Sequence, residues 1–133
     1  MKRILILIAT LVLVACIPAK SIVFDQYGEW QVIAINGNSW QGSHPPTITF
    51  SGNSISGSGG CNRYQATLES YGSTFEVGPT ASTKMACPGN ADALENSFFG
   101  VLAMVNEARM DGERLILENT REKVSMVLVS TSQ

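Results

Sequence analysis

Hydrophobic and polar residues alternate along much of the chain from residue 29 onward, the pattern of half-buried strands. In the first such stretch, the alternation assigns Trp30, Val32 and Ala34 to one face and Gln31, Ile33 and Ile35 to the other. Further strands are predicted at residues 47–50, 54–58, 65–70 and 73–77. Turns of small and polar residues separate them, because glycine, asparagine and serine tolerate tight backbone geometry.

The spacing of apolar residues changes once, after the Pro88-Gly89 pair. One apolar stripe at helical spacing then runs through Leu94, Phe98, Val101, Leu102 and Val105. This pattern predicts a helix that begins after an Asn90 N-cap and ends at Glu107 or Ala108. Asp92 and Glu95 fall in its first turns, where the helix dipole favours negative charge.

Strand patterns return after the helix. Residues 108–110 and 114–118 flank an Asp111-Gly112 turn, which is a strong hairpin signal, and residues 124–129 form the last predicted strand. The order of elements is strands, one helix, then strands. It predicts an α+β fold, a small antiparallel sheet or open barrel with a single helix packed on one face or end.

The first sixteen residues have a different character. Met1-Lys2-Arg3 is followed by an apolar run over residues 4–15 that is too short to span a bilayer but fits a signal peptide. The run ends in Leu-Val-Ala-Cys at residues 13–16, which resembles a bacterial lipobox. We therefore expect residues 1–15 to be removed and Cys16 to carry the lipid. The alternative is an ordinary secretory leader with an incidental cysteine.

Removing that leader changes the composition. The whole chain has 133 residues, is 44% hydrophobic and carries a formal charge of −2. The remaining 118 residues carry −4 and are roughly 40% hydrophobic, an ordinary value for a globular domain. This predicts a lipidated N-terminus and tether at residues 16–28 and one domain at residues 29–133. The absence of a basic excess argues against a nucleic-acid partner.

The same segment also predicts the cellular location. The lipid makes a membrane the first expected partner, since two or more acyl chains give stable anchoring. Ile17 stands where an aspartate retains many Gram-negative lipoproteins at the inner membrane. We therefore expect the bacterial envelope, and the outer membrane facing the periplasm if the source is Gram-negative.

Two cysteines remain for the domain, Cys61 and Cys87. An even pair in an oxidising compartment predicts a disulfide, which would close a loop of about 27 residues. Two buried reduced thiols are the alternative. Neither cysteine belongs to a C-x-x-C motif, so a thioredoxin-type site has no support.

Three motifs carry a resemblance to a known family. They are G-C-N-R-Y at residues 60–64, A-S-T-K-M-A-C at residues 81–87 and L-E-x-x-F at residues 94–98. At this spacing the chain resembles the META domain, the family of the heat-inducible protein HslJ, over roughly residues 29–129. One departure is Ala66, where relatives usually have a glycine two residues after the tyrosine.

The resemblance implies a small β-rich domain with one helix, often carried by envelope lipoproteins and associated with stress tolerance. It implies no catalytic residues and no cofactor, so we expect a protein that is not an enzyme and that binds a protein or another envelope ligand. One alternative is a periplasmic inhibitor of a lysozyme or protease. Another is a thiol-dependent enzyme that uses Cys61 or Cys87.

The residues themselves give little support to catalysis. His44 is the only histidine, and one histidine with two paired cysteines is a poor zinc set, so no metal site is expected. Glu69 and Glu76 flank a turn. Glu107, Asp111 and Glu113 cluster after the helix. Paired-carboxylate chemistry would need two of these groups across a substrate, and solvated turn charge is the simpler interpretation.

The polar cluster of the two cysteine motifs is the candidate binding surface. Its residues are Asn62, Arg63, Tyr64, Thr83 and Lys84. A Cys61–Cys87 disulfide would hold them side by side, and two cations with a phenol suit an acidic partner or an anionic headgroup. In the structural alternative, Asn62 forms a turn while Arg63 and Tyr64 pack on the sheet.

Overall fold

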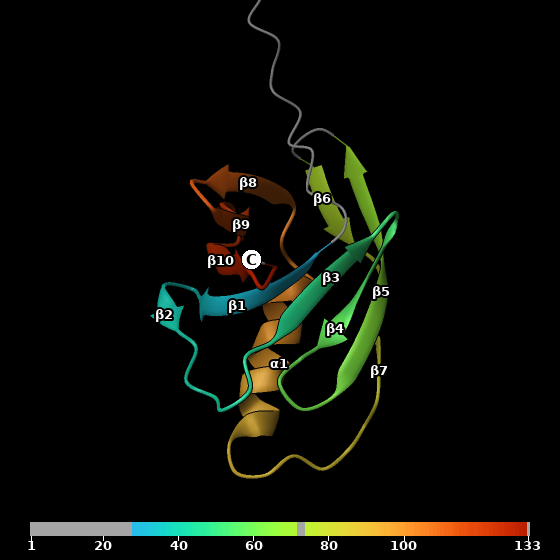
Figure 1. Cartoon of the computed structure of the whole chain (residues 1–133), viewed down its shortest axis with the longest axis vertical. Coiled ribbons are helices and arrows are strands. Elements are labelled where there is room, and N and C mark those ends of the chain that lie inside the picture. The colour runs from blue at the N-terminus through green and yellow to red at the C-terminus, as the bar shows by residue number, and fades with distance from the viewer. Residues whose placement is uncertain (1–27, 72–73, 133) are drawn as a thin grey trace, which may run out of the picture.

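Ten strands and one helix make up the part of the chain that the structure, a computed structural model, describes: residues 28–71 and 74–132 (Figure 1). The strands are β1 (Glu29–Ile35), β2 (Asn38–Ser39), β3 (Thr47–Ser51), β4 (Ser54–Ser58), β5 (Arg63–Tyr71), β6 (Thr74–Val77), β7 (Ala81–Ser82), β8 (Glu107–Asp111), β9 (Arg114–Asn119) and β10 (Val124–Ser130). The helix is α1 (Ala91–Leu102).

The strands form one antiparallel sheet in the order β10-β9-β8-β6-β5-β4-β3-β1-β2, and β7 pairs beside β5. Because β1 also pairs with β10, the sheet curls back on itself. Between β6 and β8 the ladder holds a single pair, Thr74 opposite Glu107. The sheet is therefore an uneven, partly open barrel.

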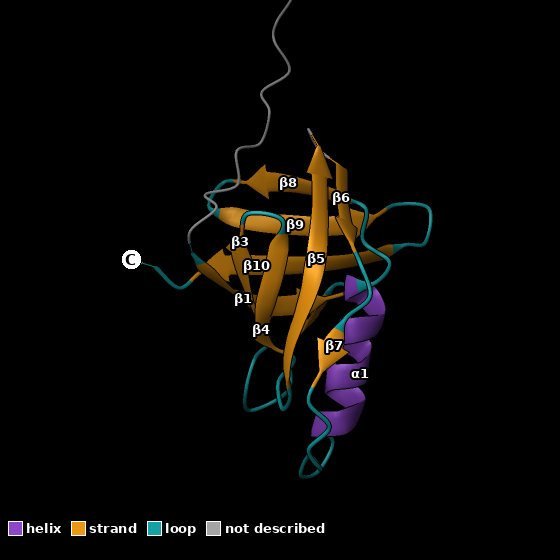
Figure 2. Cartoon of the chain, turned by 90° about the vertical axis from the view of Figure 1, so that its right-hand side faces the viewer, coloured by secondary structure: helices purple, strands orange, loops and turns teal. Residues whose placement is uncertain are grey.

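Helix α1 lies at one end of this curled sheet (Figure 2). Its residues Phe98, Val101 and Leu102 are buried in the same core as the inner side chains of the strands. A sheet that is open at one end leaves apolar side chains exposed there, and the helix covers them. The arrangement confirms the predicted α+β class.

The core comes from side chains that alternate inward along the strands. Its fully buried members include Ile48, Ile55, Phe75, Leu115, Leu117, Met126 and Leu128. Ala66, at the position where relatives usually have glycine, is an inward-facing residue of β5 opposite Ile55. Its methyl group adds to the core within a regular strand.

The predicted faces of β1 are right in its first half and wrong in its second. Trp30 and Val32 are buried, but the register with β10 shifts between Val32 and Ala34. Such a bulge inserts one extra residue and exchanges the two faces of the strand beyond it. Consequently Ile35 is buried and Ala34 is not.

The helix is shorter than predicted: it ends at Leu102, and Glu107 already begins β8. The Asn106 N–H donates to the Glu118 carbonyl at 3.1 Å, and the Asn106 carbonyl accepts from the Phe75 N–H at 2.9 Å, so this backbone belongs to the sheet. Val105 is buried from an irregular segment, which prolongs the apolar spacing beyond the helix. Asn90 does precede the helix, without a side-chain cap hydrogen bond.

The remaining strand predictions are confirmed to within a few residues, whereas β2 and β7 were not predicted because two-residue strands have no periodicity. The β8–β9 hairpin closes with Asp111 opposite Arg114, so its turn lies one residue later than expected. The predicted leader at residues 1–15 and all but residue 28 of the predicted tether lie outside the described residues. Those domain bounds therefore stay predictions.

Two glycines allow a matched test of the packing. A Cβ atom at Gly57 would overlap the Thr47 carbonyl, which accepts the Tyr64 hydroxyl, whereas one at Gly100 on the exposed side of α1 would meet nothing. We expect Gly57→Ala to lower the free energy of unfolding by about 2–3 kcal/mol. Gly100→Ala should raise it by about 0.5–1 kcal/mol. Urea denaturation measures both, and equal effects of the two changes would contradict this packing.

Candidate functional site

The two cysteine motifs lie side by side. Cys61 and Cys87 form a disulfide with a Cα–Cα distance of 6.0 Å, as the even cysteine pair predicted. Next to it, β5 pairs with β7, and the Arg63 carbonyl accepts a hydrogen bond from the Thr83 N–H at 3.0 Å. The segments 60–64 and 81–87 are thus joined covalently and by backbone hydrogen bonds.

Asn62 stands at the centre of this junction and is buried. Its Oδ1 accepts hydrogen bonds from the Met85 N–H at 2.7 Å and from the Thr83 hydroxyl at 3.0 Å. Its Nδ2 donates to Glu95 Oε2 at 2.7 Å. A single amide side chain therefore connects both cysteine motifs to α1.

Glu95 completes the junction from the helix. Its Oε1 accepts the backbone N–H of Asn62 at 2.6 Å and that of Cys61 at 3.3 Å, and the residue is 5% exposed. Gly59 leaves room for the carboxylate, since a Cβ there would lie 2.7 Å from Oε1 and 2.8 Å from Phe99 Cζ. A buried carboxylate is stable only with such donors around it. We call Asn62 and Glu95 with their partners the Asn62–Glu95 junction.

Sequence reasoning missed this role of Glu95. It assigned the residue to the helix dipole, although Glu95 also belongs to the L-E-x-x-F motif. The available signal was its spacing: Leu94 and Phe98 lie on the apolar side of the helix, and a carboxylate between them points partly inward.

Tyr64 and Asn62 correct the predicted binding surface, because both are buried. The Tyr64 hydroxyl donates to the Thr47 carbonyl at 2.9 Å, and its ring packs edge-on against Phe98 and Phe99. Burial raises the pKa of the Tyr64 hydroxyl well above its ordinary value, so the side chain stays neutral. Both residues stabilise the fold, and their side-chain polar groups are hydrogen-bonded within it.

Arg63, Thr83 and Lys84 are exposed, as the surface hypothesis requires. Arg63 and Gln65 point outward from β5, and Ala81 is exposed opposite Gln65. A shallow hollow of about 460 Å³ lies here, lined by Ser56, Arg63, Tyr64, Gln65, Ala81, Ser82 and Thr83. We call the exposed residues Arg63, Gln65, Ala81, Thr83 and Lys84 the Arg63–Lys84 face.

The thiol-enzyme alternative loses its nucleophile. His44 and Cys61 do line one hollow, but the Cys61 sulfur is bonded to Cys87 and offers no thiolate. Glu69 and Glu76 are exposed and directly opposite each other on β5 and β6, where like charges weaken strand pairing slightly.

The acidic residues that follow the helix are also exposed. Glu107 and Asp111 stand at the two ends of β8, and Glu113 lies in the turn before β9. Solvated charge at strand ends and turns explains these positions without a catalytic role.

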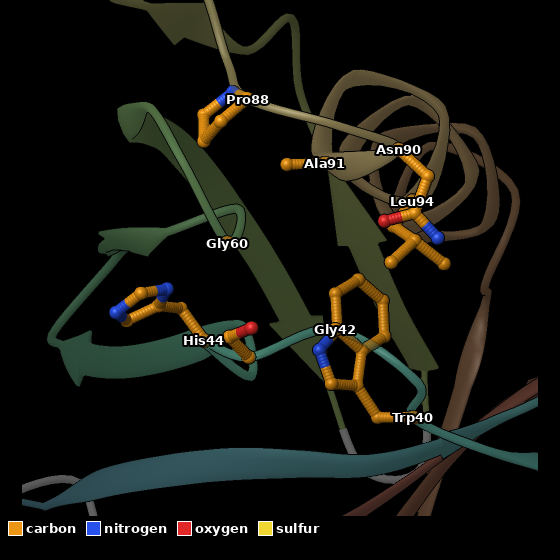
Figure 3. Close-up of a pocket in the computed structure, with 9 residues that line it drawn as sticks. Trp40, Gly42, His44, Gly60, Pro88, Asn90, Ala91 and Leu94 are labelled. Carbon is orange, nitrogen blue, oxygen red and sulfur yellow. The ribbon is translucent and has the colours of Figure 1, made fainter.

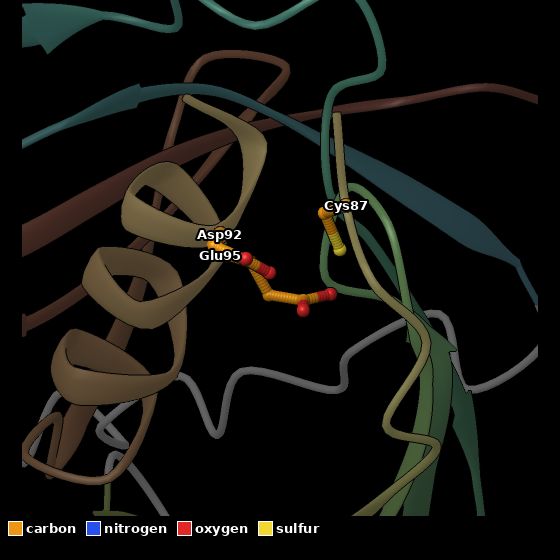
Figure 4. Close-up of side chains that lie close together, drawn as sticks. All are labelled: Cys87, Asp92 and Glu95. Atoms are coloured by element: carbon orange, nitrogen blue, oxygen red, sulfur yellow. The ribbon is translucent and has the colours of Figure 1, made fainter. Parts of the chain in front are cut away.

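One group of potential metal ligands occurs in the described part of the chain. Cys87 Sγ and carboxylate oxygens of Asp92 and Glu95 lie within 4.8 Å of one another (Figure 4). A metal ion would require a thiolate and a free carboxylate. Cys87 is in the disulfide and Glu95 already accepts three hydrogen bonds, so these residues do not fit a metal centre.

Comparisons with known proteins agree with this architecture. A family described as META domain matches residues 24–132. An NMR structure of a protein from Burkholderia xenovorans is similar with a TM-score of 0.66 and 19% identity, covering 80% of this chain and 83% of that one. A crystal structure of a DUF4847 family protein from Bacteroides vulgatus has a TM-score of 0.57 and 17% identity, covering 81% and 95%. At these identities the two structures show the fold alone. No curated protein matches the sequence.

The Asn62–Glu95 junction predicts a large stability effect at one helix position. Glu95→Ala leaves two backbone N–H groups and the Asn62 amide without their acceptor, so we expect the free energy of unfolding to fall by about 3 kcal/mol. Asn96→Ala, an exposed neighbour, should change it by less than about 0.5 kcal/mol. Urea denaturation of the oxidised protein measures both, and a Glu95 variant as stable as the wild type would contradict the assignment.

Proposed function

The chain belongs to the META domain family, and from that membership together with the lipobox-like leader at residues 1–16 we propose that it is a non-enzymatic, lipid-anchored protein of the bacterial envelope. It binds an acidic partner through the Arg63–Lys84 face and thereby contributes to envelope integrity or stress tolerance.

One observation carries the binding part of the proposal. The disulfide and the Asn62–Glu95 junction hold two segments 20 residues apart so that Arg63 and Lys84 are displayed from one rigid support. A surface that is ordered before binding loses little conformational entropy when a partner arrives. Two exposed cations on a chain with a formal charge of −2 favour a partner with acidic groups.

The groups best suited to chemistry already have structural roles, which supports a non-enzymatic protein. The two cysteines of the domain form the disulfide, the Glu95 carboxylate is saturated with donors, and the Tyr64 hydroxyl is buried against Thr47. A catalytic acid, base or nucleophile must reach a substrate. None of these groups does so here.

Anchoring rests on the leader and on Cys16, which lie outside the described residues. Among residues 28–71 and 74–132, no helix has the length and apolar character needed to cross a bilayer. Two or more acyl chains on Cys16 would attach the domain to the outer membrane, with the domain facing the periplasm in a Gram-negative cell.

Replacing the lipidated cysteine tests the anchor. Wild-type protein should fractionate with membranes and incorporate a labelled fatty acid. The Cys16→Ala variant should incorporate no labelled fatty acid and should lose the membrane attachment that depends on it. The double variant Cys61→Ala/Cys87→Ala is the control, because it removes the other two cysteines and should keep the label. Membrane attachment of the Cys16 variant equal to that of the wild type would refute the anchor.

Two cation substitutions test the face. With a photo-crosslinking residue at Gln65, we expect Arg63→Ala/Lys84→Ala to reduce partner crosslinking in intact envelopes about five- to thirtyfold, equivalent to about 1–2 kcal/mol. Stability should be nearly unchanged, since both side chains are exposed. Arg114→Ala/Arg121→Ala removes the same charge from exposed positions elsewhere and should leave crosslinking within about twofold.

Equal losses in the two double variants would show that net charge alone matters and would contradict the face. Unfolding of the Arg63/Lys84 variant would instead favour a structural role for these residues.

Inhibition assays with purified lysozymes and proteases address the inhibitor alternative. In that alternative the exposed segment at residues 84–86 would be the loop that enters the enzyme. Inhibition that Lys84→Ala abolishes would support that alternative over an envelope partner.

A further inference from the structure

A small pocket lies between Trp40 and the start of α1 (Figure 3). It shares no lining residue with the hollow of the Arg63–Lys84 face. Its volume is about 130 Å³, and it is lined by Trp40, Gly42, Ser43, His44, Gly60, Pro88, Asn90, Ala91 and Leu94. Mostly apolar walls with a few polar atoms are typical of small-molecule sites. Sequence reasoning gave no role to Trp40.

The indole N–H of Trp40 makes this pocket unusual. Trp40 Nε1 is buried and has no hydrogen-bond partner among the described residues. A buried donor without an acceptor is unfavourable, and proteins ordinarily pair such groups. An acceptor on a bound ligand would satisfy this donor.

Gly42 and Gly60 hold the indole ring closely. A Cβ at Gly42 would lie 2.7 Å from Trp40 Nε1 and 3.0 Å from Leu94 Cδ1, and one at Gly60 would lie 3.3 Å from Trp40 Cζ2. Larger residues at either position would press on the ring or fill the pocket. Gly42 lies over Nε1 in a bend outside the strands, so a ligand acceptor would reach the N–H only if Gly42 moved aside.

The surrounding charges select a neutral ligand. Asp92 is exposed in the first turn of α1, one residue after the pocket residue Ala91, and its negative charge disfavours an anion there. The indole N–H and the N-terminal end of α1 present positive dipoles, which disfavour a cation. A neutral hydrogen-bond acceptor satisfies both conditions.

The volume of the pocket also limits the size of the ligand. A cavity of about 150 Å³ holds one benzene-sized molecule, so about 130 Å³ admits only a few heavy atoms. Across Gly60 a second hollow of about 320 Å³, also lined by Ser58 and Cys61, shares His44, Pro88 and Ala91 with the pocket. A larger ligand can therefore place one small group in the pocket and extend over Gly60.

We propose that the pocket binds the acetamido group of a larger neutral ligand. The methyl group packs against Leu94, Ala91 and Pro88, and the carbonyl oxygen accepts the Trp40 Nε1–H. The rest of the ligand lies in the adjoining hollow. An N-acetylated saccharide and an N-acetylated peptide terminus both supply this group.

Titrations followed by nuclear magnetic resonance test the proposal, because the protein has two tryptophans and Trp40→Phe assigns the indole signal. Addition of N-acetylglucosamine at millimolar concentrations should shift the Trp40 indole N–H signal, whereas glucose should not. An N-acetylated, amidated dipeptide forms the second arm. Binding by one arm only identifies the source of the acetamido group.

Ala91→Leu fills the pocket from the first residue of α1 and should weaken binding at least tenfold. Ala93→Leu, an exposed position of the same helix, is the matched control and should bind as the wild type does. The remaining amide signals report whether each variant is folded. Equal shifts with glucose, binding that survives Ala91→Leu, or no shift of the Trp40 signal with either acetamido compound would overturn the proposal.

Discussion

The buried hydrogen bonds between Asn62 and Glu95 are the constraint on which the rest of the domain depends. The Asn62 amide donates to Glu95 Oε2 and accepts from Thr83 and Met85. Without a carboxylate on α1, the backbone N–H groups of the cysteine motif would be buried with no acceptor. One side-chain pair thus ties the helix to two segments that are distant in sequence.

This junction also links the two surfaces. On one side it supports Arg63 and Lys84 of the Arg63–Lys84 face. On the other side, Gly60 and Cys61 continue from the junction into the hollow beside the Trp40 pocket. The disulfide adds a covalent constraint at the same place, and its stabilisation of about 3 kcal/mol is comparable to that of the hydrogen bonds. A binding surface supported in this way can remain ordered even though it lies largely in loops.

The sequence predicted the fold class, most strands and the cysteine pairing, since periodicity and composition report directly on burial. It misplaced features that depend on tertiary contacts. The bulge after Val32 moved Ile35 inward, and residues 33–35 are all apolar, so the second half of the strand carried no local signal of which face is buried. The helix appeared too long because Val105 is buried from a loop at a helical spacing. At the site, polarity is a similarly poor guide to exposure: Asn62 and Tyr64 have polar side chains, but both are buried with hydrogen-bond partners.

The central claim is that the Asn62–Glu95 junction holds both cysteine motifs, and amide hydrogen exchange tests it most directly. In the oxidised wild-type protein the amide protons of Asn62 and Met85 should exchange slowly. In Glu95→Gln one of the two carboxylate oxygens becomes an NH2 donor, so the side chain no longer offers separate acceptors to the backbone N–H groups and to Asn62 Nδ2. The amide protons of Asn62 and Met85 should therefore lose protection together, whereas that of Val127 in β10 should keep its own. Unchanged protection of Met85 in that variant would contradict the account.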